Sequence, residues 1–253
     1  MNAGIESKDK VALVTGGASG IGKATALRFA RAGMKVVVAD INDAGIQKTL
    51  DELKPAQALG VRVDVRSETD VDAMVRKVEE SFGRIDILVH SAGILRAKDS
   101  GPKALADMTA QEMHDVVDIN LKGTFLCNRA VVPVMMKQRS GQIVNISSTS
   151  GKIGRAFDSM YCASKFGVVG LTESLAEEVR KYNIKVFLLM PDAIATPLWD
   201  QNGPIPAPED ALDPDRVAAL IEYMVGLPAD TILQNVTIAP FRGGRKKRAR
   251  SEN

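Results

Sequence analysis

A tyrosine and a lysine four residues apart are the first residues that could do acid–base chemistry. Tyr161 and Lys165 lie in the stretch YCASK, and Ser148 lies thirteen positions before the tyrosine. Residues four apart share one face of a helix, so both side chains would point into one site. We expect the ammonium to lower the pKa of the tyrosine towards neutrality and the serine hydroxyl to polarise a carbonyl oxygen. The group predicts proton transfer to and from a substrate oxygen.

A glycine-rich turn predicts a site for a phosphate-bearing ligand. Residues 15–22 read TGGASGIG and directly follow a β-branched run. Glycines let the backbone approach a ligand closely, and a helix that begins there offers free N–H groups to a pyrophosphate. Asp40 ends the next predicted strand, where a carboxylate would bind the ribose hydroxyls of an adenosine. The spacing GxxxGxG alone also suits a turn for tight packing, but its context favours a dinucleotide site.

Short β-branched runs alternate with helical patterns along the whole chain. Continuously apolar runs such as VVVA and VFLLM are typical of strands that are covered on both faces. The expected strands are Val11–Thr15, Met34–Asp40, Leu59–Val65, Ile85–His90, Gln142–Ser147, Ile184–Met190 and Thr231–Ile238. This alternation predicts one α/β domain with a doubly wound parallel sheet of about seven strands and helices on both faces.

Local signals mark where helices begin and where a long loop lies. Ser67 with Asp70, and Thr109 with Glu112, resemble capping boxes, and the apolar residues after Ser67 recur with a helical period. Residues 192–215 contain five prolines and follow a predicted strand. We expect a substrate loop there, and the alternative is a plain surface excursion.

Composition excludes several classes of protein. The 253 residues are 45% hydrophobic and 25% charged, which suits a globular chain with a sizeable core. Two cysteines, Cys127 and Cys162, argue against a disulfide framework, and no metal site is expected. No apolar run reaches the roughly 18 residues of a membrane span, and the polar start lacks a secretory signal. We therefore expect a cytoplasmic protein that does not enter a membrane.

The net charge of +2 is unevenly distributed. Residues 242–253 carry six basic side chains and one acidic one, which leaves 27 basic and 30 acidic residues in the rest of the chain. A mildly acidic body argues against a nucleic-acid partner. We expect the folded part to span about 8–241 and the basic tail, about 242–253, to be a solvated terminus.

In their order along the chain, these motifs resemble those of the short-chain dehydrogenase/reductase family. TGGASGIG matches the family's cofactor turn, VDV its adenine-contacting acid, and SAG most of its NNAG motif. INLKG, NISS and YCASK match the segments that carry its catalytic asparagine, serine, tyrosine and lysine. The resemblance covers about Lys8 to Pro240 and implies a single Rossmann-fold domain across residues 1–253.

The resemblance implies a role for each matched residue. The implied catalytic residues are Asn120, Ser148, Tyr161 and Lys165. Tyr161 would be the general acid and base, Ser148 would position the substrate oxygen, Lys165 would bind the nicotinamide ribose, and Asn120 would hold a water of the proton relay. The implied cofactor-binding residues are Gly16, Ser19, Gly20, Ile21, Gly22, Asp40, Asp64, Val65, His90, Ala92, Gly93, Tyr161, Lys165, Pro191, Ile194 and Thr196. Because relatives are mostly dimers or tetramers, a homo-dimer or homo-tetramer is implied.

Three positions depart from the family's pattern. His90 replaces the first asparagine of NNAG, and a strand-end hydrogen bond is its expected role. Residues 231–241 lack the family's VDGG ending, which leaves tetramer packing through that end open. Asp192 replaces a glycine beside the nicotinamide. Its carboxylate would repel anionic substrates if it lay at the substrate mouth, and would be a bystander if it pointed to solvent.

The leading hypothesis is an NAD-dependent alcohol dehydrogenase or carbonyl reductase, which interconverts a secondary alcohol and a ketone or aldehyde by hydride transfer. NAD(H) is expected over NADP(H), because the Asp40 carboxylate repels a 2′-phosphate and neither Ser19 nor Ile41 supplies a cation. The alternative enzyme is a 3-oxoacyl-thioester (acyl carrier protein) reductase. The alternative outside enzymes is a catalytically silent nucleotide-binding regulator, against which the intact Ser–Tyr–Lys–Asn set argues.

Several apolar residues suit two roles equally. They would either line a hydrophobic substrate pocket or pack the loop over it. These residues are Ile94, Leu95, Ile153, Phe157, Leu198 and Trp199.

Overall fold

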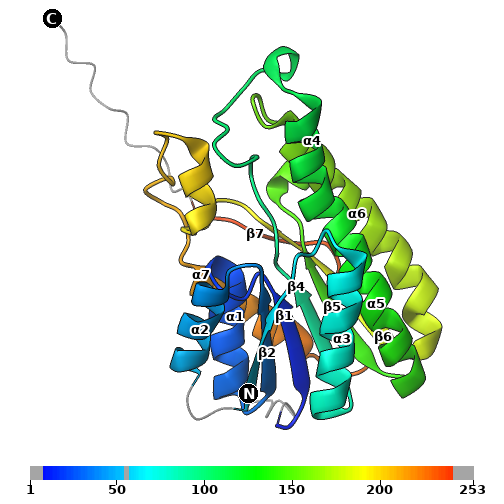
Figure 1. The fold of residues 1–253 in the computed structure, drawn as a ribbon. Coiled ribbons are helices and arrows are strands. Elements are labelled where there is room, and N and C mark those ends of the chain that lie inside the picture. Colours follow the sequence, from blue (N-terminus) through cyan, green and yellow to red (C-terminus); the bar gives the residue numbers. More distant parts are fainter. Residues whose placement is uncertain (1–7, 54–56, 242–253) are drawn as a thin grey trace, which may run out of the picture.

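A parallel sheet forms the centre of the computed structural model, which describes residues 8–53 and 57–241 (Figure 1). Its seven strands in this described part run in the order β3-β2-β1-β4-β5-β6-β7. They are β1 (Val11–Thr15), β2 (Lys35–Asp40), β3 (Ala58–Arg62), β4 (Ile87–His90), β5 (Gly141–Ile146), β6 (Ile184–Pro191) and β7 (Val236–Ile238). Every pair is parallel, and the order reverses between β1 and β4. The predicted doubly wound sheet is confirmed, and the basic tail lies outside the described residues.

Helices cover the two faces of the sheet. One face carries α1 (Gly20–Arg31), α2 (Asp43–Glu52) and α7 (Pro214–Val225). The other carries α3 (Glu68–Phe82), α5 (Gly123–Gln138) and α6 (Ser159–Val179), with α4 (Ala110–Val117) packed on α6. No helix in the described part is long and apolar enough to cross a membrane.

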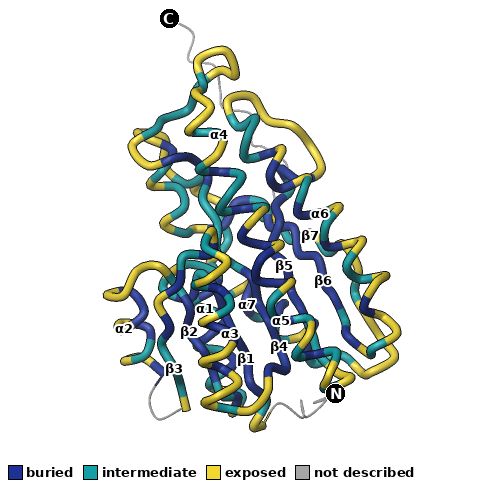
Figure 2. The backbone as a smooth tube through the Cα atoms, turned by 45° about the vertical axis from the view of Figure 1, so that its right-hand side comes forward, coloured by how far each residue is buried: buried dark blue, intermediate teal, exposed yellow. Residues whose placement is uncertain are grey.

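Alternation along the strands divides the core into two layers. In β1, Leu13 packs among the buried residues of α3 and α5, whereas Val14 packs among those of α1 and α7. Successive side chains of a strand point to opposite faces, so each buried strand contributes to both layers. Figure 2 shows the inner strands β1, β2, β4, β5 and β6 as mostly buried, whereas the edge strands β3 and β7 are largely not. Because both faces are covered, polar side chains of the strands gather at the strand ends.

The helix starts follow the predicted caps. The Ser67 Oγ accepts a hydrogen bond from the Asp70 N–H at 3.2 Å, and α3 begins one residue after Ser67. Thr109 and Glu112 form a complete capping box at the start of α4. Each cap satisfies N–H groups that the first helical turn leaves without a partner.

β3 ends earlier than predicted, and β7 begins later. β3 ends at Arg62 rather than Val65, because its only neighbour, β2, ends at Asp40 opposite Arg62. β7 begins at Val236 rather than Thr231, because it pairs only with the last three residues of β6. The bounds of β2, β4, β5 and β6 differ from the prediction by one or two residues.

The predicted substrate loop, residues 192–215, is an excursion with a pinned base; we call this range the lid. The Ala195 N–H donates to the Leu212 carbonyl at 2.8 Å, and the Leu212 N–H donates to the Ala193 carbonyl at 2.9 Å. Between these contacts lies the 3₁₀ helix η5 (Pro197–Asn202). The proline-rich stretch therefore contains a short helix, because the proline at its first position fits a helix start.

We predict that Gly22→Ala destabilises the fold and weakens dinucleotide binding. A Cβ atom at Gly22 would lie 2.2 Å from the Gly16 carbonyl oxygen, which is backbone of the glycine turn and cannot move without distorting that turn. Overpacking of this kind costs about 1 to 3 kcal/mol. Thermal unfolding and fluorescence titration with NADH measure the two effects.

Gly170→Ala is the matched control, because this exposed glycine in α6 has nothing within 4 Å of the added Cβ. It should raise stability by about 0.5 to 1 kcal/mol and leave NADH binding unchanged. Equal stability and NADH affinity of Gly22→Ala and the wild type would contradict the close approach of these backbones.

Candidate active site

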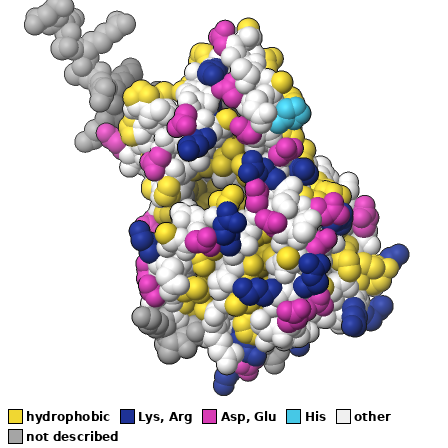
Figure 3. All heavy atoms as spheres, in the orientation of Figure 1, with side chains coloured by type: hydrophobic (Ala, Val, Ile, Leu, Met, Phe, Trp, Pro, Cys, Tyr) yellow, Lys and Arg dark blue, Asp and Glu magenta, His cyan; other side chains and the backbone are white. Residues whose placement is uncertain are grey.

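A cavity of ≈ 580 Å³ opens at the carboxyl ends of the strands, under the lid. Its walls come from the glycine turn after β1, the segments that follow β2 to β6, the start of α6, and the lid. Figure 3 shows the hollow on this face, with hydrophobic side chains in its depth and charged side chains around it. This is the position where open parallel α/β sheets bind their ligands.

Most of the residues predicted for the site line this cavity. They are Gly16, Ser19, Gly20, Ile21, Asp40, Asp64, Val65, Ala92, Gly93, Ser148, Tyr161, Lys165, Pro191, Ile194 and Thr196. Gly22, His90 and Asn120 are not part of the lining. Gly22 instead allows the close packing of α1 on the glycine turn.

The glycine turn offers unused backbone N–H groups to an anion. Gly16 and Gly20 have φ of +66° and +53°, which favour glycine, and a Cβ at Gly16 would lie 2.7 Å from the Ala92 nitrogen. At the start of α1, Ser19 makes no side-chain cap hydrogen bond, and the first turn holds no acidic residue. The free donors and the helix dipole therefore favour a bound phosphate group.

The Asp40 carboxylate is held at the cavity wall by backbone N–H groups. Its Oδ2 accepts from Ala18 at 3.1 Å and its Oδ1 from Asn42 at 3.0 Å. The structure joins it to no cation by an ion pair within the described part of the chain. Its neighbour Ile41 is half exposed and also lines the cavity. The carboxylate of Asp40 therefore lies at the cavity wall without a paired cation in the described residues.

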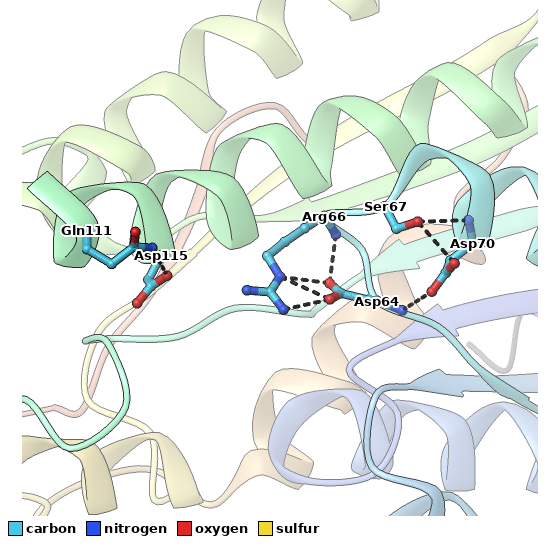
Figure 4. Close-up of polar contacts among 6 residues, drawn as sticks. All are labelled: Asp64, Arg66, Ser67, Asp70, Gln111 and Asp115. Atoms are coloured by element: carbon cyan, nitrogen blue, oxygen red, sulfur yellow. Dashed lines mark hydrogen bonds and ion pairs between the residues drawn. The ribbon is translucent and has the colours of Figure 1, made fainter.

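Asp64 is clamped by an arginine that sequence reasoning did not single out. The Arg66 Nε and Nη2 donate to both carboxylate oxygens of Asp64, the shortest contact being 2.6 Å (Figure 4). This pairing lowers the pKa of Asp64, mainly through the hydrogen bonds from Arg66. Both residues line the cavity beyond the end of β3. The clamp keeps the Asp64 carboxylate ionised and fixed in orientation.

Tyr161, Ser148 and Lys165 come together as their spacing predicts. The Ser148 side chain lies close enough to the Tyr161 hydroxyl to act on its pKa. The Ser148 Oγ accepts from the Ser150 N–H at 3.1 Å. The Lys165 Nζ lies 5.7 Å from the centre of the Tyr161 ring and donates to the Ile146 carbonyl at 3.0 Å. α6 and the end of β5 thus bring a phenol, a hydroxyl and an ammonium into one group.

The expected lowering of the tyrosine pKa is not found in this structure. Burial raises the pKa of Tyr161 to about 12, although the Ser148 side chain acts the other way. Burial also lowers the pKa of Lys165 to about 8. The reason is the same for both groups, because a buried site disfavours the charged form of each. Burial therefore outweighs the effect that we expected from the ammonium.

Asn120 lies behind the cavity wall, in a π-helical turn (Asp118–Lys122) between α4 and α5. Its Oδ1 accepts from the Ile94 N–H at 2.8 Å, and its Nδ2 donates to the Ile94 carbonyl at 2.8 Å and to the Ser164 Oγ at 3.0 Å. The side chain therefore fixes the segment after β4 against α6. A π-helical turn often marks a functional site, because it displaces one residue from the regular helix.

His90 also points into the interior rather than into the cavity. It is 1% exposed, and one ring nitrogen, Nδ1, lies 2.9 Å from the Thr15 Oγ. Burial, helped by the charge of Lys165, lowers the pKa of His90 to about 3, so the ring is neutral. The side chain joins the ends of β1 and β4, as expected from its strand-end position.

Asp192 lies at the cavity and has a charged partner. Its Oδ1 accepts from the Thr149 hydroxyl at 2.9 Å and from the Arg155 Nη2 at 3.2 Å. The Arg155 Nε also donates to the Ser150 Oγ at 3.2 Å. The carboxylate therefore lies at the cavity rather than pointing to solvent, and the guanidinium of Arg155 offsets part of its charge.

The cavity wall contains four of the six apolar residues that the sequence suggested for a substrate pocket. Ile94, Leu95, Leu198 and Trp199 line the cavity, whereas Ile153 and Phe157 do not and are 67% and 56% exposed. Polar lining residues that sequence reasoning missed include Arg155, Asp158, Gln201 and Asn202. These four lie outside the sequence motifs. The sequence marks them only as polar residues near Tyr161 or within the predicted substrate loop. No group of three or more side chains suited to a metal ion occurs in the described ranges.

Comparisons with known proteins agree with this geometry. Residues 10–204 match the family described as short chain dehydrogenase. The chain is 42% identical over 196 residues, which is 77% of either chain, to subunit BbsD of (2S)-((R)-hydroxy(phenyl)methyl)succinyl-CoA dehydrogenase from Thauera aromatica. It is 41% identical to the 3-oxoacyl-(acyl-carrier-protein) reductase of Thermotoga maritima, over 85% of this chain and 89% of that one.

A solved structure shows the same fold over almost the whole chain. The 3-ketoacyl-(acyl-carrier-protein) reductase from Brucella melitensis, complexed with NADH, superposes with a TM-score of 0.85 at 31% sequence identity. The match covers 94% of this chain and 99% of the other. The chain therefore belongs to the short-chain dehydrogenase family and is an oxidoreductase of that family.

Proposed function

We propose that the protein is an NAD-dependent oxidoreductase that interconverts a secondary alcohol and a ketone or aldehyde. The observation that carries the proposal is the group of Tyr161, Ser148 and Lys165 at one end of the cavity, with the glycine turn and Asp40 at the other. One cavity then holds an acid–base group together with a surface suited to a dinucleotide.

The residues around the cavity fit a nicotinamide dinucleotide. The unused N–H groups at the start of α1 suit the pyrophosphate, and the Asp40 carboxylate suits the hydroxyls of the adenosine ribose. Gly93 leaves room near Lys165, since a Cβ there would lie 3.5 Å from the Lys165 Nζ. The lysine is thus positioned to bind the second ribose.

In the proposed reaction, the nicotinamide and the protein side chains would supply different parts of the chemistry. When bound, the nicotinamide would supply or accept a hydride at the substrate carbon. In the direction of reduction, Tyr161 donates its phenolic proton to the substrate oxygen while the Ser148 hydroxyl donates a hydrogen bond to it. In the direction of oxidation, Tyr161 accepts that proton. With a raised pKa, the phenol is protonated at neutral pH, which is the form that donates the proton in reduction.

The uncompensated charge of Asp40 supports NAD(H) over NADP(H). A 2′-phosphate on the adenosine ribose would lie beside this carboxylate, and Ile41 offers no cation to offset the repulsion. A homo-dimer or homo-tetramer is supported by two phenylalanines, Phe125 on α5 and Phe166 on α6, which the single chain leaves nearly half exposed.

A 3-oxoacyl-thioester reductase or 3-hydroxyacyl-thioester dehydrogenase is the second candidate. The two curated relatives described above carry names that specify an acyl-CoA and an acyl carrier protein. The reacting group of such a substrate is also a ketone or a secondary alcohol. Activity measured with NAD(H) and NADP(H) on secondary alcohols, sugars, steroids and 3-oxoacyl thioesters separates the two candidates.

We predict that Tyr161→Phe lowers kcat by about 10²- to 10⁴-fold, which is the usual contribution of a general acid or base. NADH binding should stay close to that of the wild type, because the ring remains and only the transferable proton is lost. Steady-state kinetics and fluorescence titration with NADH measure the two effects. Tyr223→Phe, at an exposed tyrosine of α7, is the control that should retain kcat. Undiminished turnover in Tyr161→Phe would overturn the mechanism.

We predict that the double variant Asp40→Ala, Ile41→Arg shifts the ratio of NADH to NADPH affinity by at least about tenfold towards NADPH. The change removes one repulsive charge and adds a partner for the phosphate, and about 1.4 kcal/mol corresponds to tenfold. Asp43→Ala is the control, since Asp43 lies outside the cavity lining and pairs with Arg62. Equal affinity of the native protein for both cofactors would contradict the role of Asp40.

We predict opposite changes in charge preference for Asp192→Asn and Arg155→Gln. Asp192→Asn leaves the guanidinium without this carboxylate and should raise kcat/KM for a carboxylate-bearing ketone over its neutral analogue by about threefold to tenfold. Arg155→Gln should lower the same ratio. Both changes should shrink at high salt, because screening weakens charges that water reaches. The same direction of change in both variants would show that the pair does not act through its charge.

A further inference from the structure

A buried arginine outside the group of Tyr161, Ser148 and Lys165 contacts two other segments of the chain. Arg96 follows β4, and its side chain is 8% exposed. Its Nη2 donates to the Asn202 Oδ1 at 2.8 Å and lies 2.7 Å from the Asp158 Oδ1. Its Nη1 donates to the Phe157 carbonyl at 2.8 Å. The planar guanidinium can satisfy several acceptors at once, so Arg96 joins the segment after β4, the lid and the start of α6.

The lid docks on the Arg96 segment through both residues that end η5. The Gln201 Oε1 accepts from the backbone N–H groups of Leu95 and Arg96, at 2.8 and 3.2 Å. The buried Asn202 side chain accepts from the guanidinium, and a hydrogen bond from a charged donor is stronger than a neutral one. These contacts hold η5 across the cavity, which Trp199 lines from the same helix.

On the other side, Arg96 holds an unusual turn in front of the catalytic helix. Phe157 has φ of +66°, a conformation that a bulky side chain rarely adopts unless its surroundings impose it. Arg96 binds the carbonyl of this residue and the carboxylate of the next, Asp158, which caps α6. Tyr161 follows three residues later, in the first turn of the helix. The orientation of that first turn therefore depends on Arg96.

We propose that Arg96 is a positioning residue that holds the closed lid against the start of α6, so that closure of the lid and placement of Tyr161 for proton transfer are coupled. The inference rests on the proposed function only in the role it gives Tyr161. The contact between lid and helix stands on the geometry alone.

Arg96 also pairs with a carboxylate, that of Asp158, which acts on the pKa of Tyr161. The Asp158 carboxylate acts to raise the pKa of Tyr161, whereas Arg155 acts to lower it, and burial is the largest cause. Four groups near this part of the cavity lie on α6 or just before it, namely Arg155, Asp158, Cys162 and Lys165. The others are Ser148 after β5, Asp192 after β6 and the neutral His90 behind Lys165. The Arg96 guanidinium, paired with Asp158, therefore offsets the carboxylate that acts to raise the pKa of Tyr161.

Trp199, the single tryptophan of the chain, reports on the lid without any substrate. Its indole is partly buried, and its Nε1 donates to the Ile194 carbonyl at 2.9 Å. Opening of η5 would expose the indole to water and to a soluble quencher. Acrylamide quenching of Trp199 in the free enzyme therefore tests the coupling independently of activity.

Single substitutions separate the contact of Arg96 with the lid from its contact with the start of α6. In Arg96→Met both contacts are lost, so quenching of Trp199 should rise, KM for the best ketone of the panel should rise about tenfold, and kcat should fall because the first turn of α6 is no longer held. Asn202→Ala removes only the lid contact, so quenching and KM should rise while kcat stays near that of the wild type. Asp158→Asn removes only the charge paired with Arg96 at the start of α6, so kcat should fall while quenching stays unchanged.

Arg96→Lys retains a cation beside Asp158 but cannot reach all three acceptors. It should keep kcat near that of the wild type while Trp199 becomes more accessible. Thermal unfolding of both variants shows whether Arg96→Met still folds. Unchanged quenching in Arg96→Met and Arg96→Lys would overturn the proposal, as would a wild-type kcat in both Arg96→Met and Asp158→Asn. If Tyr161→Phe retained activity, the proposed chemistry would fail while the quenching result still decided the contact between lid and helix.

Discussion

A parallel sheet that is covered by helices on both faces can expose polar groups only where its strands end, and the rest of this structure follows from that constraint. Apolar side chains fill the two layers on either side of the strands. The carboxyl ends of all seven described strands lie on one edge of the sheet, because every pair is parallel. The glycine turn, the group of Tyr161, Ser148 and Lys165, and the lid all lie at that edge, so residues distant in the sequence share one cavity.

Burial at that edge sets the charges of the site. It keeps His90 neutral, lowers the pKa of Lys165 to about 8 and raises that of Tyr161 to about 12, because a low dielectric disfavours each charged form. Charged groups nearer the surface are paired instead, as in the contacts of Arg155 with Asp192 and of Arg66 with Asp64. Asp40 is held by backbone N–H groups without such a pair, which is why we assign it the choice of cofactor.

Polar contacts through Arg96 connect the lid to the start of α6. Gln201 and Asn202 bind the segment after β4 by hydrogen bonds, and Arg96 carries the connection to Asp158. Such contacts exchange readily with water, whereas an apolar interface would have to expose its surface to separate. The arrangement suits a lid that closes over a substrate and opens again.

The sequence alone was sufficient for the sheet, the helix starts and most of the cavity lining. Strand and helix periods are local patterns, caps such as that of Thr109 and Glu112 act within one turn, and the spacing of Tyr161 and Lys165 is fixed by the helix. The glycine turn was predictable because its glycines follow a strand directly and recur at a spacing typical of such turns.

Tertiary structure decided everything that depends on partners distant in the chain. β3 ends at Arg62 because its neighbour ends there, and Asp192 is offset by Arg155, 37 residues away. The pKa of Tyr161 rises because the fold buries it, although the sequence suggested the reverse. Arg96 gave no signal at all in the sequence, since its partners Asp158 and Asn202 lie on segments that meet only after the sheet has brought the ends of β4, β5 and β6 together. Local patterns specify which elements form, but the charge and position of a side chain in a site depend on which distant segments pack against it.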